Sequence, residues 1–324
     1  MSTFIHSDLD TVEILMQRYA VEPAHAQHVA QLAVGLFDLF QPVHRLSTRA
    51  RELLETGALL HNVGWSVDEP THDLVGRDII IASSLQAFDP TERAMLACMV
   101  AFHRKPVEPD AEPLMQALSD EQRQQTLALS AILRVADGLD CSQTQTTQIE
   151  RSESGDEEAD YEEVRVSGPY SHEDAARATK KADLWNSLFP PLRLVARMTR
   201  PGLTPQDSLA CAGRRVLRYQ MEQLPMSDWS VQDGELPRHG QVHQLRVTAR
   251  RLRSQLRVFK SYYKSKAVQP IAGGLRDLTV ALTGAREQDV TLSALKHYQK
   301  TADEASCASI QPVVGLWQQE REQA

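Results

Sequence analysis

The chain lacks any long apolar run, and this absence excludes a helical membrane span. None of its 324 residues belongs to a stretch approaching the roughly 20 apolar residues that a spanning helix needs. The first ten residues, MSTFIHSDLD, have neither the basic region nor the apolar stretch of a secretory signal. With 42% hydrophobic and 24% charged residues, the composition is that of a soluble globular protein, and we expect a cytoplasmic one.

Cysteine is scarce and scattered. No two cysteines form a C-x-x-C pair, so the sequence indicates neither a disulfide framework nor a thiolate zinc site. Burial as small apolar residues accounts for all of them. The four are Cys98, Cys141, Cys211 and Cys307.

Acidic residues are missing from one stretch of an otherwise acidic chain. The formal net charge is −8, yet residues 238–266 contain nine Lys or Arg and no Asp or Glu. Basic positions recur there in alternating steps of three and four, which places them on one face of a helix with about 3.6 residues per turn. These positions are His243, Arg246, Arg250, Arg253, Arg257, Lys260 and Lys264.

The apolar positions of this stretch keep the same spacing one residue earlier, as at Leu245, Ala249, Leu252 and Leu256. Such a helix packs along its apolar face and presents the basic face to a cleft or to solvent. A solvated face is the ordinary explanation of a charge run, but solvated faces usually alternate signs, and this one repels itself. The pattern therefore favours a polyanion-binding face.

The same residues resemble a known family. The pattern H-x-x-R-x-x-x-R-R-L-R-x-x-L-x-x-F, from His243 to Phe259, resembles the opening motif of the CHAD family, the conserved-histidine α-helical domain. Residues 286–290, REQDV, resemble that family's later R-D-x-D-V segment, from which Glu287 and Gln288 depart. The resemblance implies an all-helical domain that binds inorganic polyphosphate. The residues it implies for binding are His243, Arg246, Arg250, Arg251, Arg253, Arg257, Lys260 and Lys264.

Two further expectations concern this basic segment. Nucleic acid is the other polyanion to consider, but single-strand binders stack bases on aromatic rings, and here only Tyr262 and Tyr263 stand at the end of the stretch. We therefore expect polyphosphate rather than nucleic acid. The resemblance implies a full-length domain built from two related helical bundles, and residues 201–324 suffice for only one bundle. We therefore expect either a half-size CHAD domain that homo-oligomerisation completes or a truncated CHAD domain.

The first 200 residues are predicted to be helical almost throughout, and several of the predicted helices end in a polar group. Residues 24–40 carry His28 at the edge of an apolar face, and residues 49–62 carry His61. The sequence Asp89-Pro90-Thr91-Glu92 predicts a capped helix that leads to His103. Residues 126–138 are apolar almost all round, so Asp137 at their end is costly unless it is paired or metal-bound.

Together these groups resemble the HD-domain metal phosphohydrolases, in which H…HD…D holds a divalent metal. The segments LLHNVGW (59–65), AFHRKP (101–106) and ILRVADGLD (132–140) resemble the C-terminal helical region of the exopolyphosphatase and guanosine pentaphosphate phosphohydrolase family, over about residues 10–200. The resemblance implies a site for Mg²⁺, Mn²⁺ or another divalent ion, with two catalytic candidates near the phosphate. The implied ligands are His28, His61, Asn62 and Asp137, and the catalytic candidates are His72 and His103.

Asn62 departs from the family pattern, because it stands where the motif has an aspartate. An amide supplies a neutral oxygen in place of an anionic ligand, so we expect weakened metal affinity. Two functions remain open. One is a polyphosphate-binding protein with a degenerate or weak metal site, acting in phosphate metabolism or its regulation; the other is an active metal-dependent phosphohydrolase acting on polyphosphate or a nucleotide.

The organisation follows from breaks in the pattern. Residues 146–150 and 163–167 are predicted to pair as a small β-hairpin across an acid-rich segment. The cluster Arg200-Pro201-Gly202 indicates a boundary between two domains. We therefore predict a mainly α protein, with an HD-type helical fold and a small hairpin in residues 1–200 and a half-size helical-bundle CHAD domain in residues 201–324.

Overall fold

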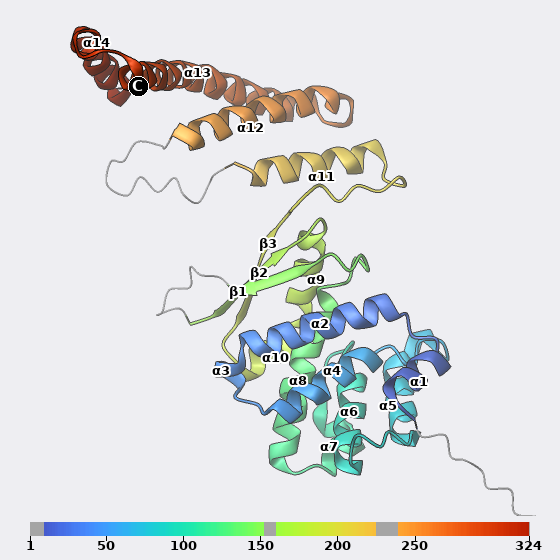
Figure 1. Cartoon of the computed structure of the whole chain (residues 1–324). Helices are drawn as coiled ribbons and strands as arrows, with labels where there is room; N and C mark the ends of the chain where they lie inside the picture. The colour runs from blue at the N-terminus through green and yellow to red at the C-terminus, as the bar shows by residue number, and fades with distance from the viewer. Residues whose placement is uncertain (1–9, 152–159, 225–238, 324) are drawn as a thin grey trace, which may run out of the picture. The chain divides into compact units, whose positions relative to one another are not determined.

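The computed structural model describes residues 10–151, 160–224 and 239–323, without the side chains of residues 239–243, 284–286, 288–289 and 320–323 (Figure 1). The chain divides into two compact units, with the division after Thr199. Helices dominate both units, which confirms the mainly α prediction. In the described ranges, no helix combines the length and the apolar character that a membrane crossing requires.

The first unit is built from helices around one buried helix, α8. Two short 3-10 turns, Glu69–Thr71 and Pro109–Ala111, precede α5 and α7. The α-helices are α1 (Val12–Arg18), α2 (Pro23–Leu39), α3 (Gln41–His44), α4 (Thr48–Leu60), α5 (His72–Ala82), α6 (Pro90–Phe102), α7 (Pro113–Gln116), α8 (Asp120–Gly138), α9 (Ser171–Lys181) and α10 (Asp183–Leu188).

The C-terminal part of α8 lies at the centre because it is apolar on nearly every side. A capping box between Ser119 and Gln122 starts it, and all but one of residues 128–138 are buried. A helix that is apolar all round needs neighbours on every side, and α2, α4, α6, α9 and α10 supply them. The predicted start of α6 is also confirmed, since Asp89 and Glu92 form a capping box around Pro90.

Glycine permits the closest of these contacts. A Cβ atom on Gly138 would lie 2.6 Å from the Cα atom of Ala178, so only a residue without a side chain lets α9 approach the end of α8 this closely. The contact is to backbone, which cannot yield as a flexible side chain does. It brings the last turn of α9 beside the last turn of α8.

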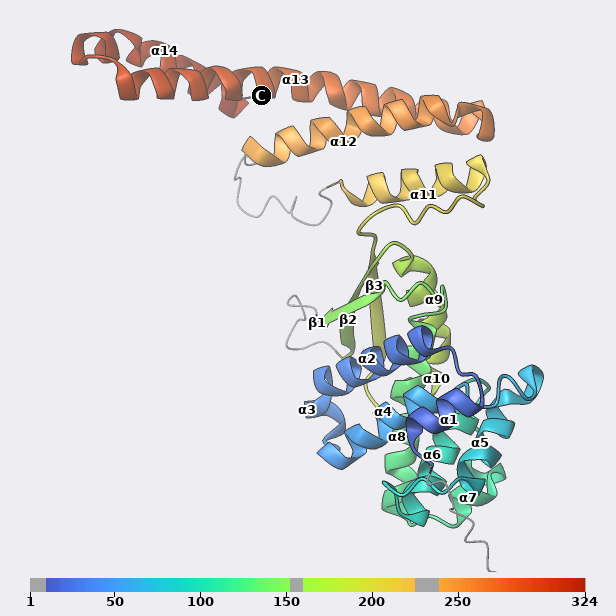
Figure 2. The same ribbon diagram turned by 45° about the vertical axis from the view of Figure 1, so that its right-hand side comes forward.

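A three-stranded sheet completes the first unit (Figure 2). Strands β1 (Gln148–Arg151) and β2 (Glu162–Ser167) pair antiparallel, which confirms the predicted hairpin; residues 152–159 of its acid-rich connection lie outside the described residues. Strand β3 (Leu192–Arg197) pairs parallel to β2 and was not predicted. Helix α9 packs on β3, and α2 contacts β1.

The second unit consists of α11 (Leu209–Glu222), α12 (His239–Val258), α13 (Ser265–Thr301) and α14 (Glu304–Gln323). Helix α12 contacts both α11 and α13, and Leu217, Leu252 and Leu256 form a small core. The predicted apolar face of α12 is therefore confirmed. The prediction of one continuous basic stripe to Lys264 is wrong, because the α-helix ends at Val258 and a 3-10 turn, Lys260–Tyr262, follows.

Candidate functional site

Four histidines and an aspartate of the first unit gather from five helices. We call His25, His61, His72, His103 and Asp137 the histidine–aspartate cluster. His25 lies in the first turn of α2, His61 and His103 cap the C-termini of α4 and α6, His72 begins α5, and Asp137 is in the last turn of α8. The four histidines are buried, and the Asp137 side chain is 16% exposed. Each member of the histidine–aspartate cluster therefore lies at or near the end of a helix.

A second glycine contact helps to assemble the cluster. A Cβ atom on Gly64 would lie 2.3 Å from the carbonyl oxygen of His72. The turn after His61 therefore approaches the start of α5 as only glycine permits. This approach brings the segment that carries His61 against the helix that begins with His72.

Hydrogen bonds to the Nδ1 atoms orient three of the imidazoles. A carbonyl or carboxylate oxygen only accepts, so each of these Nδ1 atoms carries a proton and leaves Nε2 as the free nitrogen unless the ring is doubly protonated. Such partners fix the tautomer of metal-binding histidines in other proteins. The acceptors are Asp140 Oδ2 for His25 (2.7 Å), the Ala58 carbonyl for His61 (2.6 Å) and the Val100 carbonyl for His103 (2.6 Å).

Three members of the cluster fit a divalent metal. Asp137 Oδ1 lies 3.7 Å from His25 Nε2 and 3.6 Å from His61 Nε2, and ligand atoms of the three residues lie within 4.8 Å of one another. Among the described residues, the buried His61 Nε2 has no hydrogen-bond partner, which is unusual for a buried nitrogen. Two imidazoles and one carboxylate form a known donor set for catalytic metals.

The structure corrects one residue of the predicted ligand set. His25, and not His28, lies with His61 and Asp137. His28 is one turn further along α2 and half-buried. The sequence contained a signal for His25, because it precedes the buried Val29 by four residues and so shares its helix face.

Asn62 adjoins the cluster in the turn after His61. It is half-buried, and its backbone carbonyl accepts a hydrogen bond from the Trp65 N–H. Its amide brings no negative charge to the group, so Asp137 is the one acid within it. Coordination through Asn62 stays a prediction.

The two catalytic candidates lie beside this group. His72 Nε2 and His103 Nε2 are 3.2 Å apart, and the ring of His103 is 5.4 Å from that of His61. The Nδ1 atoms of both rings lie next to carbonyl oxygens, that of His72 at 2.7 Å from the Glu69 oxygen, so this hydrogen bond requires that one of the two Nε2 atoms is also protonated. The Trp65 ring lies against that of His72, with the two ring centroids 4.7 Å apart and the planes tilted by 53°.

Lys181 is a member of the site that the sequence did not indicate. It is the last residue of α9 and is 7% exposed. Its Nζ donates to Asp137 Oδ2 and, at 3.1 Å, to the carbonyl oxygen of His103. Asp137 thus directs Oδ1 toward the histidines and Oδ2 toward the lysine. This pairing satisfies the buried carboxylate, as the sequence required.

Burial and these contacts divide the protonation states of the cluster. Burial lowers the pKa of His61 to about 4 and that of His103 well below its usual value. Burial also acts to lower the pKa of His25, but hydrogen bonds to Asp137 and Asp140 outweigh it and raise the pKa to about 9. Burial would raise the pKa of Asp137, yet Lys181 and the histidines hold it well below its usual value.

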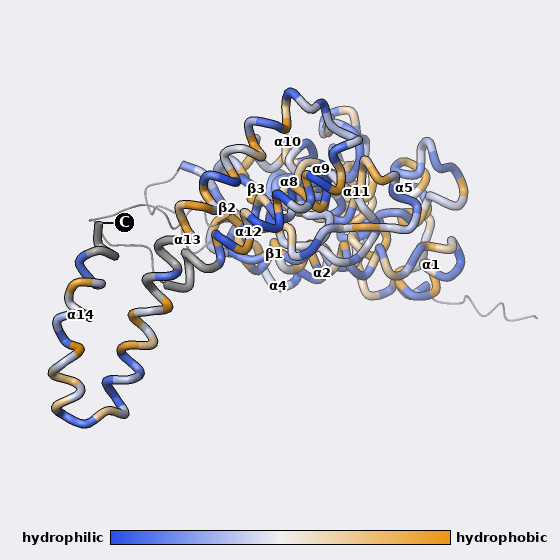
Figure 3. Tube along the Cα trace, turned by 90° about the horizontal axis from the view of Figure 1, so that it is seen from above, coloured by the Kyte–Doolittle hydropathy of each residue, from blue (hydrophilic) through white to orange (hydrophobic). Residues whose placement is uncertain are grey.

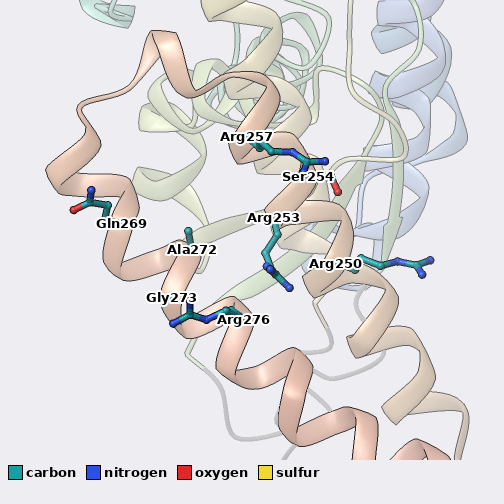
Figure 4. A pocket seen from close by; sticks show the side chains of 8 residues that line it. All are labelled: Arg250, Arg253, Ser254, Arg257, Gln269, Ala272, Gly273 and Arg276. Carbon is teal, nitrogen blue, oxygen red and sulfur yellow. The ribbon is translucent and has the colours of Figure 1, made fainter.

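The second unit contains a separate basic site, which we call the arginine pocket. It is a cavity of about 560 Å³, and Figure 4 shows that one helix, α12, supplies three of its arginines and the facing helix α13 supplies Arg276. Among the described residues, no acidic side chain pairs with the three arginines of α12. The lining residues are Arg250, Arg253, Ser254, Arg257, Gln269, Ala272, Gly273 and Arg276.

The arginine pocket holds only part of the predicted polyphosphate-binding set. Arg246 is half-buried, and Arg251 is exposed outside the pocket lining. Lys260 and Lys264 are exposed beyond the end of α12. The side chain of His243 lies outside the described residues, as do those of Arg286 and Asp289 in the second motif. Arg276 was missed, because helical spacing within one segment cannot indicate a residue on the facing helix.

Comparisons with known proteins agree with the division into two units. Residues 9–180, more than half of the chain, match the family model for Ppx/GppA phosphatase, domain III, and residues 215–324 match the CHAD domain. The chain is similar to guanosine-5'-triphosphate,3'-diphosphate pyrophosphatase of Aeromonas hydrophila subsp. hydrophila, with 31% identity over 150 residues, and of Aeromonas salmonicida, with 27%. Each alignment covers 46% of this chain and 30% of the relative, so it spans less than a third of the relatives' length.

Proposed function

Because the chain belongs to the Ppx/GppA phosphatase, domain III, family, we propose that it serves phosphate metabolism or its regulation, and that it does so by binding inorganic polyphosphate. The observation that carries this proposal is the arginine pocket. Four arginines from two helices line one cavity, and those of α12 have no acidic partner among the described residues. An uncompensated cluster of this kind attracts a polyanion.

Arginine suits a chain of phosphates in particular. Its planar guanidinium binds two phosphate oxygens at once, which a lysine ammonium does not do. Arg250, Arg253 and Arg257 recur at about one helical turn, so they present cations at regular intervals along α12. Such a row of cations can bind a chain of repeated anionic groups without contacting a nucleobase, which favours polyphosphate over nucleic acid.

The first unit, in this proposal, carries a weak metal site of the HD type. His25 Nε2, His61 Nε2 and Asp137 Oδ1 would hold the divalent ion, and Mg²⁺ and Mn²⁺ are candidates. A bound ion would supply Lewis-acid polarisation of a phosphoryl oxygen. The chain's own residues hold the donors in place through the Nδ1 hydrogen bonds, while neutral Asn62 leaves the site with one anionic ligand.

Charge reversal in the arginine pocket tests polyphosphate binding. Arg250→Glu with Arg253→Glu should abolish retention on immobilised polyphosphate, while circular dichroism shows unchanged helicity. Arg251→Glu is the matched control, because it makes the same kind of change on the same helix outside the pocket lining. Equal retention of the double variant and the parent would contradict the proposal, and so would equal competition by duplex DNA at matched charge.

A second candidate function is metal-dependent phosphohydrolysis. The observation that favours it is the His72–His103 pair beside His61, since imidazoles are suited to proton transfer at a phosphate. Phosphate release from polyphosphate and from guanosine pentaphosphate, measured with Mn²⁺, separates the two functions. Release that disappears in His61→Ala would establish the hydrolase, whereas equal background in both proteins agrees with binding alone.

A further inference from the structure

Lys181 places its amino group against the histidine–aspartate cluster. The close approach of α9 to Gly138 sets its position, because Ala178, which meets Gly138, lies one turn before Lys181. The ammonium group donates one hydrogen bond to Asp137 Oδ2 and another to the carbonyl oxygen of His103. It therefore contacts both a member of the metal-type group, which is His25, His61 and Asp137, and a histidine next to that group. A lysine is ordinarily exposed at the protein surface, so the burial of Lys181 calls for a specific explanation.

The acid of the metal-type group, Asp137, already has a cationic partner. Its Oδ2 pairs with Lys181, while the neighbouring Asp140 accepts a hydrogen bond from His25 Nδ1 at 2.7 Å. Asn62, in the turn after His61, adds no negative charge beside it. A divalent ion would therefore enter a group whose one acid, Asp137, already pairs with the ammonium of Lys181, and like charges repel strongly in a buried site.

We infer that Lys181 is a built-in cation that takes over the charge role of a divalent metal in this cluster, and that it lowers metal affinity together with Asn62. This inference rests on the weak metal site of the proposed function and names its cause. The alternative is that Lys181 merely ties α9 to α6 through the His103 carbonyl. The two differ in their effect on metal binding, because only a charge role predicts a gain when the ammonium is removed.

Removal of the charge tests this inference. Lys181→Met keeps a similar length without the ammonium, and Lys180→Met is the matched control on the exposed neighbouring residue. Mn²⁺ and Zn²⁺ binding is measured by calorimetry and by elemental analysis after dialysis. Lys181→Met should bind Mn²⁺ at least about tenfold more tightly than the parent, the size of effect typical of groups next to metal ligands. Asn62→Asp with Lys181→Met should bind most tightly, and Lys180→Met should equal the parent.

Three outcomes would overturn the role of Lys181. One is a folded Lys181→Met variant that binds no better than the parent. Another is full metal occupancy in the single variant Asn62→Asp, in which Lys181 is still present. That result would remove the role of Lys181 but not the proposal that the parent protein binds metal weakly. The third is stoichiometric metal in the parent, which overturns the weak site as well; polyphosphate retention by the second unit is a separate measurement.

The parent protein gives a check that needs no variant. If Lys181 already balances Asp137, neither a chelator nor millimolar Mn²⁺ should shift the thermal unfolding midpoint of the first unit. A marked rise with Mn²⁺ would contradict the inference, because ligands that bind the native state stabilise it by mass action. Lys181→Gln serves as a second variant where Lys181→Met does not fold, with the same expected gain in Mn²⁺ affinity.

Discussion

His44 is a buried histidine whose two hydrogen bonds require the neutral ring. Its Nε2 donates to the Phe37 carbonyl at 2.9 Å, and its Nδ1 accepts from the Leu46 N–H at 3.0 Å. Protonation of Nδ1 would replace this acceptor with a second donor. Burial lowers the pKa of His44 below its ordinary 6.5, in agreement with that requirement.

This residue predicts a pH dependence of stability. Below pH 6.5, His44 binds a proton in the unfolded chain but not yet in the folded chain. The contribution of His44 to the free energy of unfolding, which is fully present above pH 6.5, is therefore lost as the pH falls toward and through the lowered pKa of the folded state. His44→Gln removes the titrating group and should flatten this part of the profile. Urea unfolding at several pH values measures it, with exposed His297→Gln as the control. Parallel profiles for His44→Gln and the parent would refute this role.

At the residue scale, the sequence predicted most of the cluster but not its charge balance. His61, His72, His103 and Asp137 come together as the motif order indicated. The prediction named His28, whereas the structure places His25, one turn earlier on α2, beside His61 and Asp137. Lys181 could not be foreseen, because its place depends on a contact between two helices that are distant in sequence.

At the scale of elements, the contact between α8 and α9 positions the site. Gly138→Ala would place a Cβ atom 2.6 Å from the Cα of Ala178, so α9 must move. We expect a loss of about 1–3 kcal/mol in the free energy of unfolding, typical of overpacking. Urea denaturation measures it. Gly35→Ala is the control, because its Cβ would meet the end of the Ile149 side chain at 3.1 Å, which can move. Equal stability of the two variants would count against this contact.

Local signals predicted the elements that depend on local chemistry. The capping box of α6, the hairpin and the apolar face of α12 are such cases. Strand β3 was missed because its parallel pairing with β2 joins segments separated by α9 and α10, and no turn signal marks it. Helices α9 and α10 are separate because the chain turns at Ala182.

For the whole molecule, exposed apolar side chains on the second unit predict self-association. Apolar residues recur along α13 and α14 (Figure 3). Val280 is 69% exposed, Val290 49% and Leu316 55%, and exposed apolar patches commonly mark interaction sites. We expect a homo-oligomer by light scattering, and Val280→Lys with Leu316→Lys should dissociate it. A parent that is monomeric at every concentration would contradict this expectation.

The most direct test of polyphosphate binding is its salt dependence. Affinity for a short polyphosphate is measured over a range of salt concentrations in the parent, in Arg253→Gln and in Arg251→Gln. If Arg253 contacts phosphate in the arginine pocket, its loss should reduce the slope of log affinity against log salt by about one, as for a phosphate contact in nucleic-acid complexes. Arg251→Gln should keep the parent slope. Identical slopes in all three proteins would show that the arginine pocket is not where polyphosphate binds.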